Sequence, residues 1–327
     1  MNRLTQLGGL LAVLAAPVVS ASPIVVLSEN FEDPSYSTTT SLHLVAPGRF
    51  KRSNLGLADT TFVVVNDDVP GGLNSGNAMV YTAGVAGAGT AREILRVTGT
   101  PAVLVQDGDR INLSFRFRSL TIPNTPDNAE FRFGLSYSFG TDQGNPYPDP
   151  MLIATGAADD RVLFNRIDVG PRTSSRQPVA SVFRQLASDN SYHLAGPNGP
   201  LPGGFLNLNA ANNGTTLTGF LPPAASGFVN DTLPRLVEAE LLRTSATGLT
   251  YTIRIDSVLV LERIITGVSD TANFLTSIDQ VAFGAGIGAA GNPTYLVDDV
   301  VLSYTPIPEP AAASVLALFT PLMLRRR

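Results

Sequence analysis

Hydrophobic and polar residues alternate along several short segments of this chain. In the clearest case, Ile111, Leu113, Phe115 and Phe117 are separated by Asn112, Ser114, Arg116 and Arg118. Successive side chains of a strand point to opposite faces, so this pattern predicts a half-buried strand. The same pattern occurs at Phe131 to Tyr137 and at Tyr251 to Ile255.

Shorter apolar segments between turn residues predict further strands. They are Phe62 to Val65, Met79 to Tyr81, Val103 to Val105, Val258 to Leu261 and Val281 to Phe283. The segment from Arg235 to Leu242 fits a short helix started by Pro234 or a strand equally well. The 30 glycines and 24 prolines favour turns over long helices. Many short strands with little helix predict an all-β fold, a two-sheet antiparallel jelly-roll-like sandwich.

The N-terminus has the layout of a secretory signal peptide. Arg3 precedes an apolar stretch from Leu7 to Val19, and small residues lead up to a cleavage site between Ala21 and Ser22. We therefore expect residues 1–21 to form a signal helix that signal peptidase removes. The alternative is an N-terminal helix of the core.

The C-terminus combines three features in order. Pro308, Glu309 and Pro310 precede an uncharged stretch from Ala311 to Leu324, and Arg325, Arg326 and Arg327 end the chain. As a helix this stretch is about 21 Å long, which is short for a hydrocarbon core of roughly 30 Å. Arginines beside an apolar helix hold that end on the cytoplasmic side. We expect a short apolar helix here, with transient membrane association.

This C-terminal pattern resembles the PEP-CTERM sorting signal of exported proteins in Gram-negative bacteria. The resemblance implies that an exosortase-like protease removes the tail. It also implies inner-membrane tethering followed by delivery to the cell surface or extracellular matrix. The predicted organisation is a signal peptide over 1–21, a β-sandwich over 22–305 and a sorting tail over 306–327. The alternative for the tail is a permanent membrane anchor.

Composition narrows the possible partners. Between Ser22 and Thr305 there are 18 basic and 26 acidic residues, a balance that disfavours nucleic acid and anionic lipid. The chain has no cysteine, which excludes disulfides, thiolate metal sites and a cysteine nucleophile.

The two ends of the predicted sandwich carry a second resemblance. Asn30-Phe31-Glu32-Asp33 opens it, and a segment from Tyr295 to Leu302 containing Asp298 and Asp299 closes it. These motifs resemble jelly-roll carbohydrate-binding modules and laminin-G or concanavalin-A-like domains. The resemblance implies neighbouring first and last strands, and a structural Ca²⁺ held by Glu32, Asp298 and Asp299. The alternative is that these carboxylates pair with arginines or cap turns.

Candidate catalytic residues are few. His43 and His193 are the two histidines, and neither has a recognisable ligand nearby in sequence. Glu238 and Glu240 have the spacing of paired carboxylates on one strand face, but neighbouring arginines favour a solvated face. Glu130 stands alone at the start of a strand. Gly286 to Gly291 matches a dinucleotide fingerprint, but a strand-like segment follows it where a helix is required.

The sequence also lacks tryptophan, the ring that most often stacks on sugars. Tyr147, in a Pro-, Gly- and Asn-rich stretch, is the candidate for that role. On this basis we expect a non-enzymatic, exported matrix or surface protein with a polysaccharide as a possible partner. Two alternatives remain, a carbohydrate-binding module and a jelly-roll glycoside hydrolase or lyase.

Overall fold

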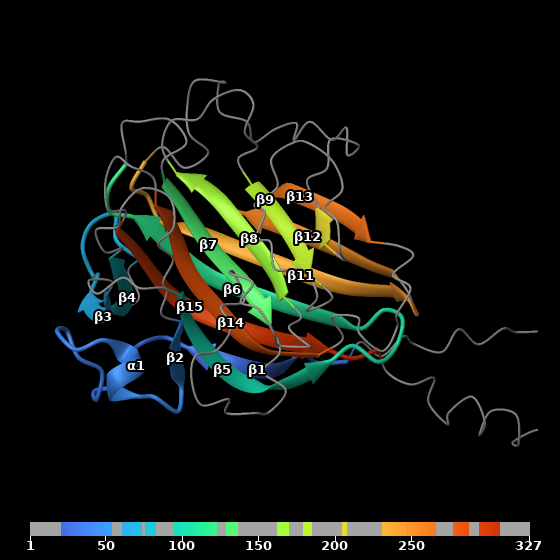
Figure 1. The fold of residues 1–327 in the computed structure, drawn as a ribbon, viewed down its shortest axis with the longest axis horizontal. Coiled ribbons are helices and arrows are strands. Elements are labelled where there is room, and N and C mark those ends of the chain that lie inside the picture. Colours follow the sequence, from blue (N-terminus) through green and yellow to red (C-terminus); the bar gives the residue numbers. More distant parts are fainter. Residues whose placement is uncertain are drawn as a thin grey trace, which may run out of the picture. The chain divides into compact units, whose positions relative to one another are not determined.

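The computed structural model describes residues 21–53, 61–73, 76–82, 94–122, 129–136, 162–169, 179–184, 205–207, 231–246, 248–265, 277–287 and 294–307. Pro23–Pro306 group into one compact unit, a sandwich of two antiparallel sheets (Figure 1). The predicted all-β sandwich is therefore confirmed. The predicted terminal helices lie outside the described residues. Within those residues, no helix is long and apolar enough to cross a membrane.

Sheet A contains eight strands. In spatial order they are β13 (Val258–Ile265), β12 (Gly248–Ile255), β11 (Arg235–Ser245), β6 (Arg110–Ser119), β15 (Thr294–Thr305), β4 (Asn77–Thr82) and β3 (Thr61–Asn66), with β1 (Ile24–Glu29) also paired to β15. The segment from Arg235 to Leu242 is thus a strand. Its alternation of buried and partly exposed residues decides between the two possibilities left open by the sequence.

Sheet B contains seven strands. Their spatial order is β10 (Phe205–Asn207), β9 (Val179–Arg184), β8 (Val162–Val169), β7 (Ala129–Ser136), β14 (Ser277–Ile287), β5 (Ile94–Val103) and β2 (Phe50–Ser53). A one-turn helix, α1 (Leu42–Val45), precedes β2. The sequence prediction missed β2, β8, β9 and β10, and it placed a strand at Val103 to Val105 where β5 is ending.

The first and last strands are neighbours, as the sequence motifs predicted. Strand β1 pairs antiparallel with β15, and the register places Ile24 opposite Tyr304 and Glu29 opposite Val300. The chain therefore enters and leaves the sandwich at adjacent positions.

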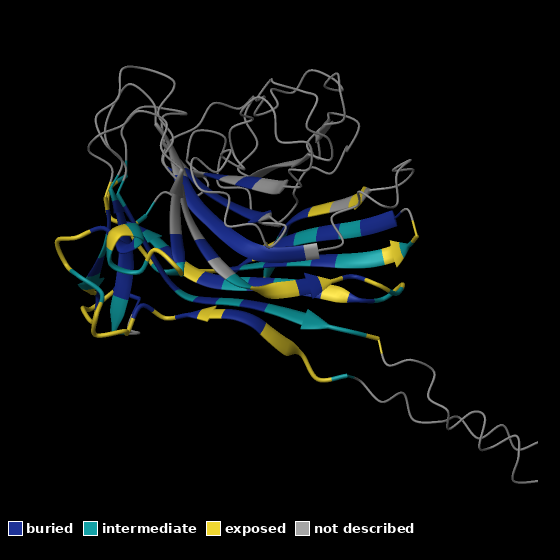
Figure 2. Cartoon of the chain, turned by 60° about the horizontal axis from the view of Figure 1, so that its bottom comes forward, coloured by how far each residue is buried: buried dark blue, intermediate teal, exposed yellow. Residues whose placement is uncertain are grey.

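Aromatic rings fill the space between the two sheets. Phe117 of β6 stacks on Phe131 of β7 with ring centroids 4.7 Å apart, and Phe115 meets Phe283 of β14 edge-on at 5.1 Å. All four side chains are buried in the core, and the buried positions follow the strands of both sheets (Figure 2). The alternation seen in the sequence thus marks which face of each strand meets the other sheet.

One buried polar contact crosses this core. The Tyr251 hydroxyl of β12 donates to Asn165 Oδ1 of β8 at 2.7 Å, and both residues are fully buried. Burial raises the pKa of Tyr251 well above its ordinary value. A buried hydroxyl without a partner is costly, so this bond fixes β8 relative to sheet A.

Candidate functional site

The candidate site is the outer face of sheet B, the face turned away from the core. On β7 the core side is formed by Phe131, Phe133 and Leu135, so Arg132 and Gly134 lie on the outer face. On β14 the core residues Val281 and Phe283 likewise place Gln280, Ala282 and Gly284 on the outer face.

Small residues occupy the middle of this outer face. Gly134 lies opposite Ala282, and Gly284 lies opposite Arg132 in the β7–β14 ladder. All three of these small residues are buried, although they lie on the outer face.

The polar residues beside these small residues are well shielded from water. Arg132 is 3 % exposed and Gln280 is 1 % exposed, although both lie on the outer face. A guanidinium or amide in such a position needs hydrogen-bonding partners. Screening from water also strengthens any electrostatic contact made there.

Strand β8 adds an aromatic position and a second arginine to the outer face. The register places Phe164 opposite Gly134 and Arg166 opposite Arg132. Asn165 lies between these two residues and points to the core, where its hydrogen bond with Tyr251 holds β8 in place.

Two acidic residues meet in the same ladder. Glu130 of β7 lies directly opposite Asp168 of β8. Like charges directly opposite one another destabilise a sheet, so stability alone does not favour this pairing. The sequence prediction missed the pair because Asp168 lies on a strand that was not recognised. The alternation around Phe131 was the one available signal, since it already placed Glu130 on the polar face.

Two of the three residues predicted to bind calcium have polar partners of another kind. Among the described residues, no three His, Cys, Asp or Glu could hold a metal ion. Glu32 instead accepts the backbone N–H of Asn77 at 2.5 Å and its side-chain amide at 3.1 Å. Asp299 forms an ion pair with Arg116 at 3.4 Å, and Asp298 is fully buried. These contacts correspond to the alternative in which the carboxylates pair with arginines or backbone groups.

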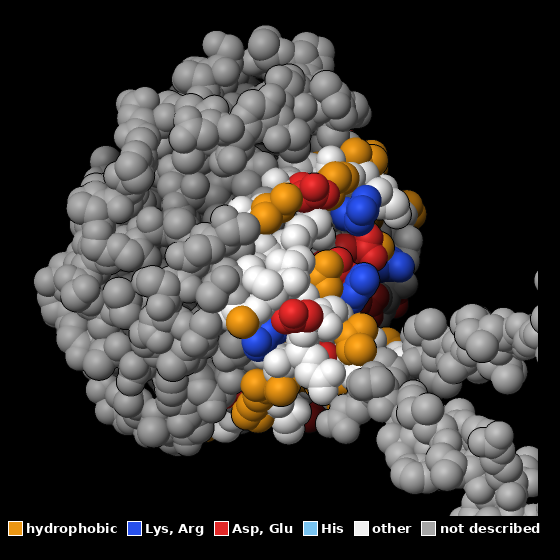
Figure 3. Space-filling view, turned by 90° about the vertical axis from the view of Figure 1, so that its right-hand side faces the viewer, with side chains coloured by type: hydrophobic (Ala, Val, Ile, Leu, Met, Phe, Trp, Pro, Cys, Tyr) orange, Lys and Arg blue, Asp and Glu red, His pale blue; other side chains and the backbone are white. Residues whose placement is uncertain are grey.

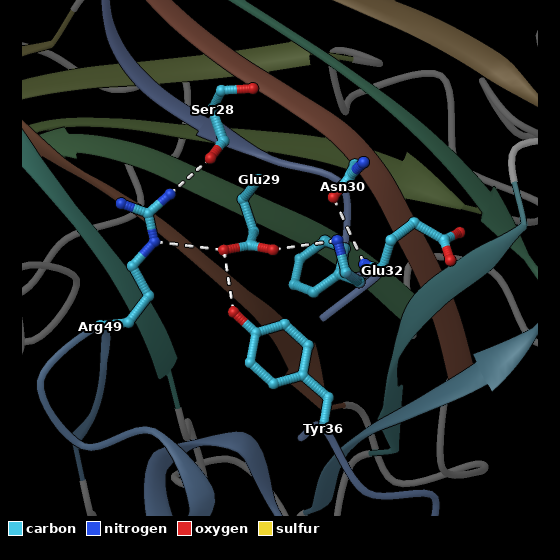
Figure 4. A network of polar contacts seen from close by, with 7 residues as sticks. Ser28, Glu29, Asn30, Glu32, Tyr36 and Arg49 are labelled. Carbon is cyan, nitrogen blue, oxygen red and sulfur yellow. Dashed lines mark hydrogen bonds and ion pairs between the residues drawn. The ribbon is translucent and has the colours of Figure 1, made fainter. Parts of the chain in front are cut away.

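The neighbouring Glu29 forms a second carboxylate network (Figure 4). It accepts hydrogen bonds from Phe31 N at 2.9 Å, from the Tyr36 hydroxyl at 3.2 Å and from Arg49 Nε at 3.1 Å. Burial, together with the negative charge of Glu29, raises the pKa of Tyr36 above its ordinary value. Phe31 has a positive φ of 56°, and the network holds the chain in this turn after β1.

The other sequence candidates are not brought together. Glu240 forms an ion pair with Arg110 at 3.1 Å on the outer face of sheet A, which agrees with the solvated face expected for Glu238 and Glu240. His43 lies in α1. Gly286 lies inside β14, and β15 is the next described element, so the dinucleotide fingerprint is not formed. Tyr147, His193 and the sorting residues Pro308, Glu309, Pro310 and Arg325 to Arg327 lie outside the described residues.

Comparison with known proteins identifies similar structures but no family. No family model matches the chain, and no curated protein sequence matches it. An alginate lyase solved with an alginate trisaccharide is 14 % identical, with 85 % of this chain and 97 % of that chain covered and a TM-score of 0.45. An endo-1,3-beta-glucanase from Streptomyces sioyaensis is 13 % identical, with 90 % and 100 % covered and a TM-score of 0.44. The basic winged bean lectin with Tn-antigen is 13 % identical, with 87 % and 100 % covered and a TM-score of 0.41.

These structures are β-sandwiches of the jelly-roll or concanavalin-A-like type, which agrees with the resemblance seen at the ends of the body. They also correct one expectation. The sequence predicted a non-enzymatic protein, and this is contradicted because similar structures include a lyase and a glucanase. The sequence offered Glu130 without a partner, because Asp168 lies on β8, a strand that the sequence analysis did not recognise.

Proposed function

We propose that this domain is a carbohydrate-active enzyme of the glycoside hydrolase type that holds a polysaccharide against the outer face of sheet B. The observation that carries this proposal is the direct opposition of Glu130 and Asp168 across the β7–β8 ladder. The register places the two acidic residues at facing positions on one side of the sheet. Retaining glycosidases act through a pair of carboxyl groups on one surface.

In this proposal the two carboxyl groups share the chemistry of a retaining glycosidase. One protonates the glycosidic oxygen as the bond to the leaving sugar breaks, while the other attacks the anomeric carbon and forms a glycosyl ester. Water then attacks the anomeric carbon, gives a proton to the first carboxylate and releases the sugar. Both carboxyl groups return to their starting states.

The remaining residues of this face supply the binding surface. Arg132 and Gln280, which are almost fully shielded from water, lie on this face beside Gly134, Ala282 and Gly284, and they are the polar groups that would orient a bound sugar. The second candidate function is a glycan-binding module without catalysis. The shielded Arg132 and Gln280 favour it, because binding needs polar groups that orient a ligand and requires no carboxylate pair.

Reducing-end release from a panel of polysaccharides, measured with the full-length chain, tests the proposal. Glu130→Gln and Asp168→Asn should each lower kcat by about 100-fold or more, with little change in KM. Glu238→Gln is the matched control, because Glu238 lies on the outer face of sheet A. Circular dichroism should show that all three variants fold.

Three results are informative. Loss of cleavage in both variants, with activity retained in the control, supports the hydrolase. Polysaccharide binding without cleavage by the parent chain favours the glycan-binding module. Neither binding nor cleavage across the panel would overturn both functions.

A further inference from the structure

Exposed apolar side chains lie at the corner of the sandwich where the chain enters and leaves it. Ile24 and Val25 of β1 are 55 % and 58 % exposed. Val103, the last residue of β5, is 40 % exposed, and Val105 just beyond it is 61 % exposed. Scattered exposed apolar residues are ordinary, but a group of them marks an interaction site. We call these four residues the exit corner.

Backbone pairing and hydrogen bonds bring the residues of the exit corner together. Ile24 lies opposite Tyr304 in the β1–β15 ladder. The Tyr304 hydroxyl donates to Asp109 Oδ2 at 3.0 Å, and the same oxygen accepts the backbone N–H of Val105 at 2.7 Å. Strands β1 and β5 are also in contact with each other. One carboxylate thus ties the start of β1, the end of β15 and the segment after β5 into one surface.

Charged side chains beside the exit corner are paired with opposite charges. Arg110, opposite Thr305 of β15, forms an ion pair with Glu240 at 3.1 Å. Arg243 forms an ion pair with Asp107 at 3.4 Å. The start of β1 and the end of β15 lie at the right of Figure 1, the side that Figure 3 shows, where hydrophobic side chains of the described residues lie among acidic and basic ones. The corner therefore has little net charge with which to attract a strongly charged partner.

The two apolar terminal segments of the sequence are attached to the chain close to this corner. The apolar stretch that ends at Val19 lies five residues before Ile24, and Ala311, the start of the C-terminal apolar stretch, follows Thr305 by six residues. An extended chain covers at most about 3.5 Å per residue, so each stretch begins within roughly 20 Å of the corner. The C-terminal stretch is predicted to associate with a membrane. A bilayer that receives it therefore lies within reach of the exit corner.

We propose that the exit corner rests on a lipid surface, with its four apolar side chains in the interfacial layer of a bilayer. Removal of these side chains from water supplies the driving force. Because the neighbouring charges are paired, the contact requires no anionic lipid, which agrees with the net charge of −5 of the chain. The proposal goes beyond the proposed function and does not depend on the carboxylate pair of sheet B.

Binding of the full-length chain to vesicles of phosphatidylcholine tests the proposal, with co-sedimentation as the measure of affinity. A corner variant carries Ile24→Thr, Val25→Thr and Val105→Thr. We expect it to bind about tenfold or more weakly than the parent, because apolar contacts are replaced by polar groups of similar shape. Added salt should change the affinity of the parent by less than about twofold, since few charges take part.

A second triple variant is the matched control. It carries Leu44→Thr, Val69→Thr and Leu233→Thr, which replace as many exposed apolar residues outside the exit corner. These residues lie in α1, in the loop after β3 and in the segment before β11. The control should bind like the parent, and circular dichroism should show that both variants fold.

The absence of tryptophan from the chain permits a direct measure of contact. Val105→Trp places a single fluorescent reporter in the exit corner, and Leu44→Trp places one elsewhere. Brominated phosphatidylcholine quenches a tryptophan that touches the bilayer. We expect loss of fluorescence on vesicle binding for Val105→Trp and no loss for Leu44→Trp.

Each outcome decides the proposal. Weaker binding by the corner variant, together with quenching in Val105→Trp, supports it. Equal binding by the corner variant and the parent overturns it, because the terminal segments then account for the whole interaction. Absence of vesicle binding by the parent also overturns it. A dimer that the corner variant loses, without vesicle binding, would assign the corner to a second copy of the chain instead.

Discussion

At the candidate site, the two sheets are held together by the buried polar side chain of Asn165. Asn165 lies between Phe164 and Arg166 on β8, and it accepts the hydroxyl of Tyr251 across the core. Its amide nitrogen also donates to the Phe133 carbonyl at 3.4 Å. The outer-face positions of β8 are therefore set by a contact on the opposite side of the strand.

Replacing Tyr251 with Phe removes this bond and keeps the ring. We expect Tyr251→Phe to lower the free energy of unfolding by about 1–3 kcal/mol, because the Asn165 oxygen loses a buried donor. Urea denaturation measures the change. The double variant Tyr251→Phe with Asn165→Leu should cost less than the sum of the single changes, since both polar partners are gone. Strict additivity would contradict the bond's role.

Glu32 permits an equally direct test. We expect Glu32→Ala to lower the free energy of unfolding by about 1–2 kcal/mol, because the backbone N–H and side chain of Asn77 lose their acceptor. Thermal unfolding with and without a calcium chelator gives the measurement. The loss should be the same in both conditions if Glu32 acts through Asn77. A loss that vanishes in chelator would instead support calcium at this position.

At the scale of elements, the loop between β3 and β4 shows how polar contacts bind a segment to the outside of a sheet. Arg118 forms an ion pair with Asp67 at 3.1 Å and donates to the Gly71 carbonyl at 2.6 Å. Asp67 in turn accepts the backbone N–H of Leu73 at 2.7 Å. Leu73 is fully buried in a small cluster with Ala78, Val80 and Leu296 on the outer face of sheet A.

This cluster is separate from the main core, so its contribution can be measured alone. We expect Leu73→Ala to lower the free energy of unfolding by about 2–4 kcal/mol, since it leaves a cavity beneath the loop. Chemical denaturation provides the measurement. Leu44→Ala is the control, because Leu44 is 66 % exposed in α1, and it should change stability by no more than about 0.5 kcal/mol. Equal effects would show that the loop does not bury Leu73 in solution.

The elements that could be predicted from sequence are those whose two faces differ. Strand β6 was recognised because Phe115 and Phe117 alternate with polar residues, and β12 because Tyr251 and Ile253 do the same. Strand β8 was not recognised from the sequence, because Phe164 places an apolar residue on the outer face and so interrupts the alternation. Since Asp168 lies on β8, its pairing with Glu130 could not be foreseen. Register between strands distant in sequence is set by tertiary packing, which a local pattern does not record.

The stability of the whole sandwich depends on pH, because tyrosines in different parts of it have shifted pKa values. Tyr304 near the end of β15 donates to Asp109 at 3.0 Å, and burial together with that carboxylate raises its pKa to about 12. Tyr36 and Tyr251 have raised pKa values as well. The neutral form of each is favoured in the folded state, so their stabilisation is complete below pH 10 and is lost as pH rises from 10 through 12.

We therefore expect the free energy of unfolding to fall between pH 9 and pH 11.5, as measured by urea denaturation at each pH. Tyr304→Phe should lower stability at pH 9 and reduce the slope between the two pH values, because one of the titrating groups is removed. Ser303→Ala, at the neighbouring position, should leave the slope unchanged. An identical slope in Tyr304→Phe and the parent would contradict the assignment.

The pairing of Ile24 with Tyr304 also determines how the sandwich responds to a pulling force. Tension applied to the two ends acts at one corner and runs across the β1–β15 ladder instead of along it. Its hydrogen bonds then break one after another, as in a zipper, and each step needs little force. Tension between one end and a distant point on a sheet would load many bonds of that ladder at once. The same domain would yield easily when held by both ends and resist strongly when held by one end and a distant point on sheet B.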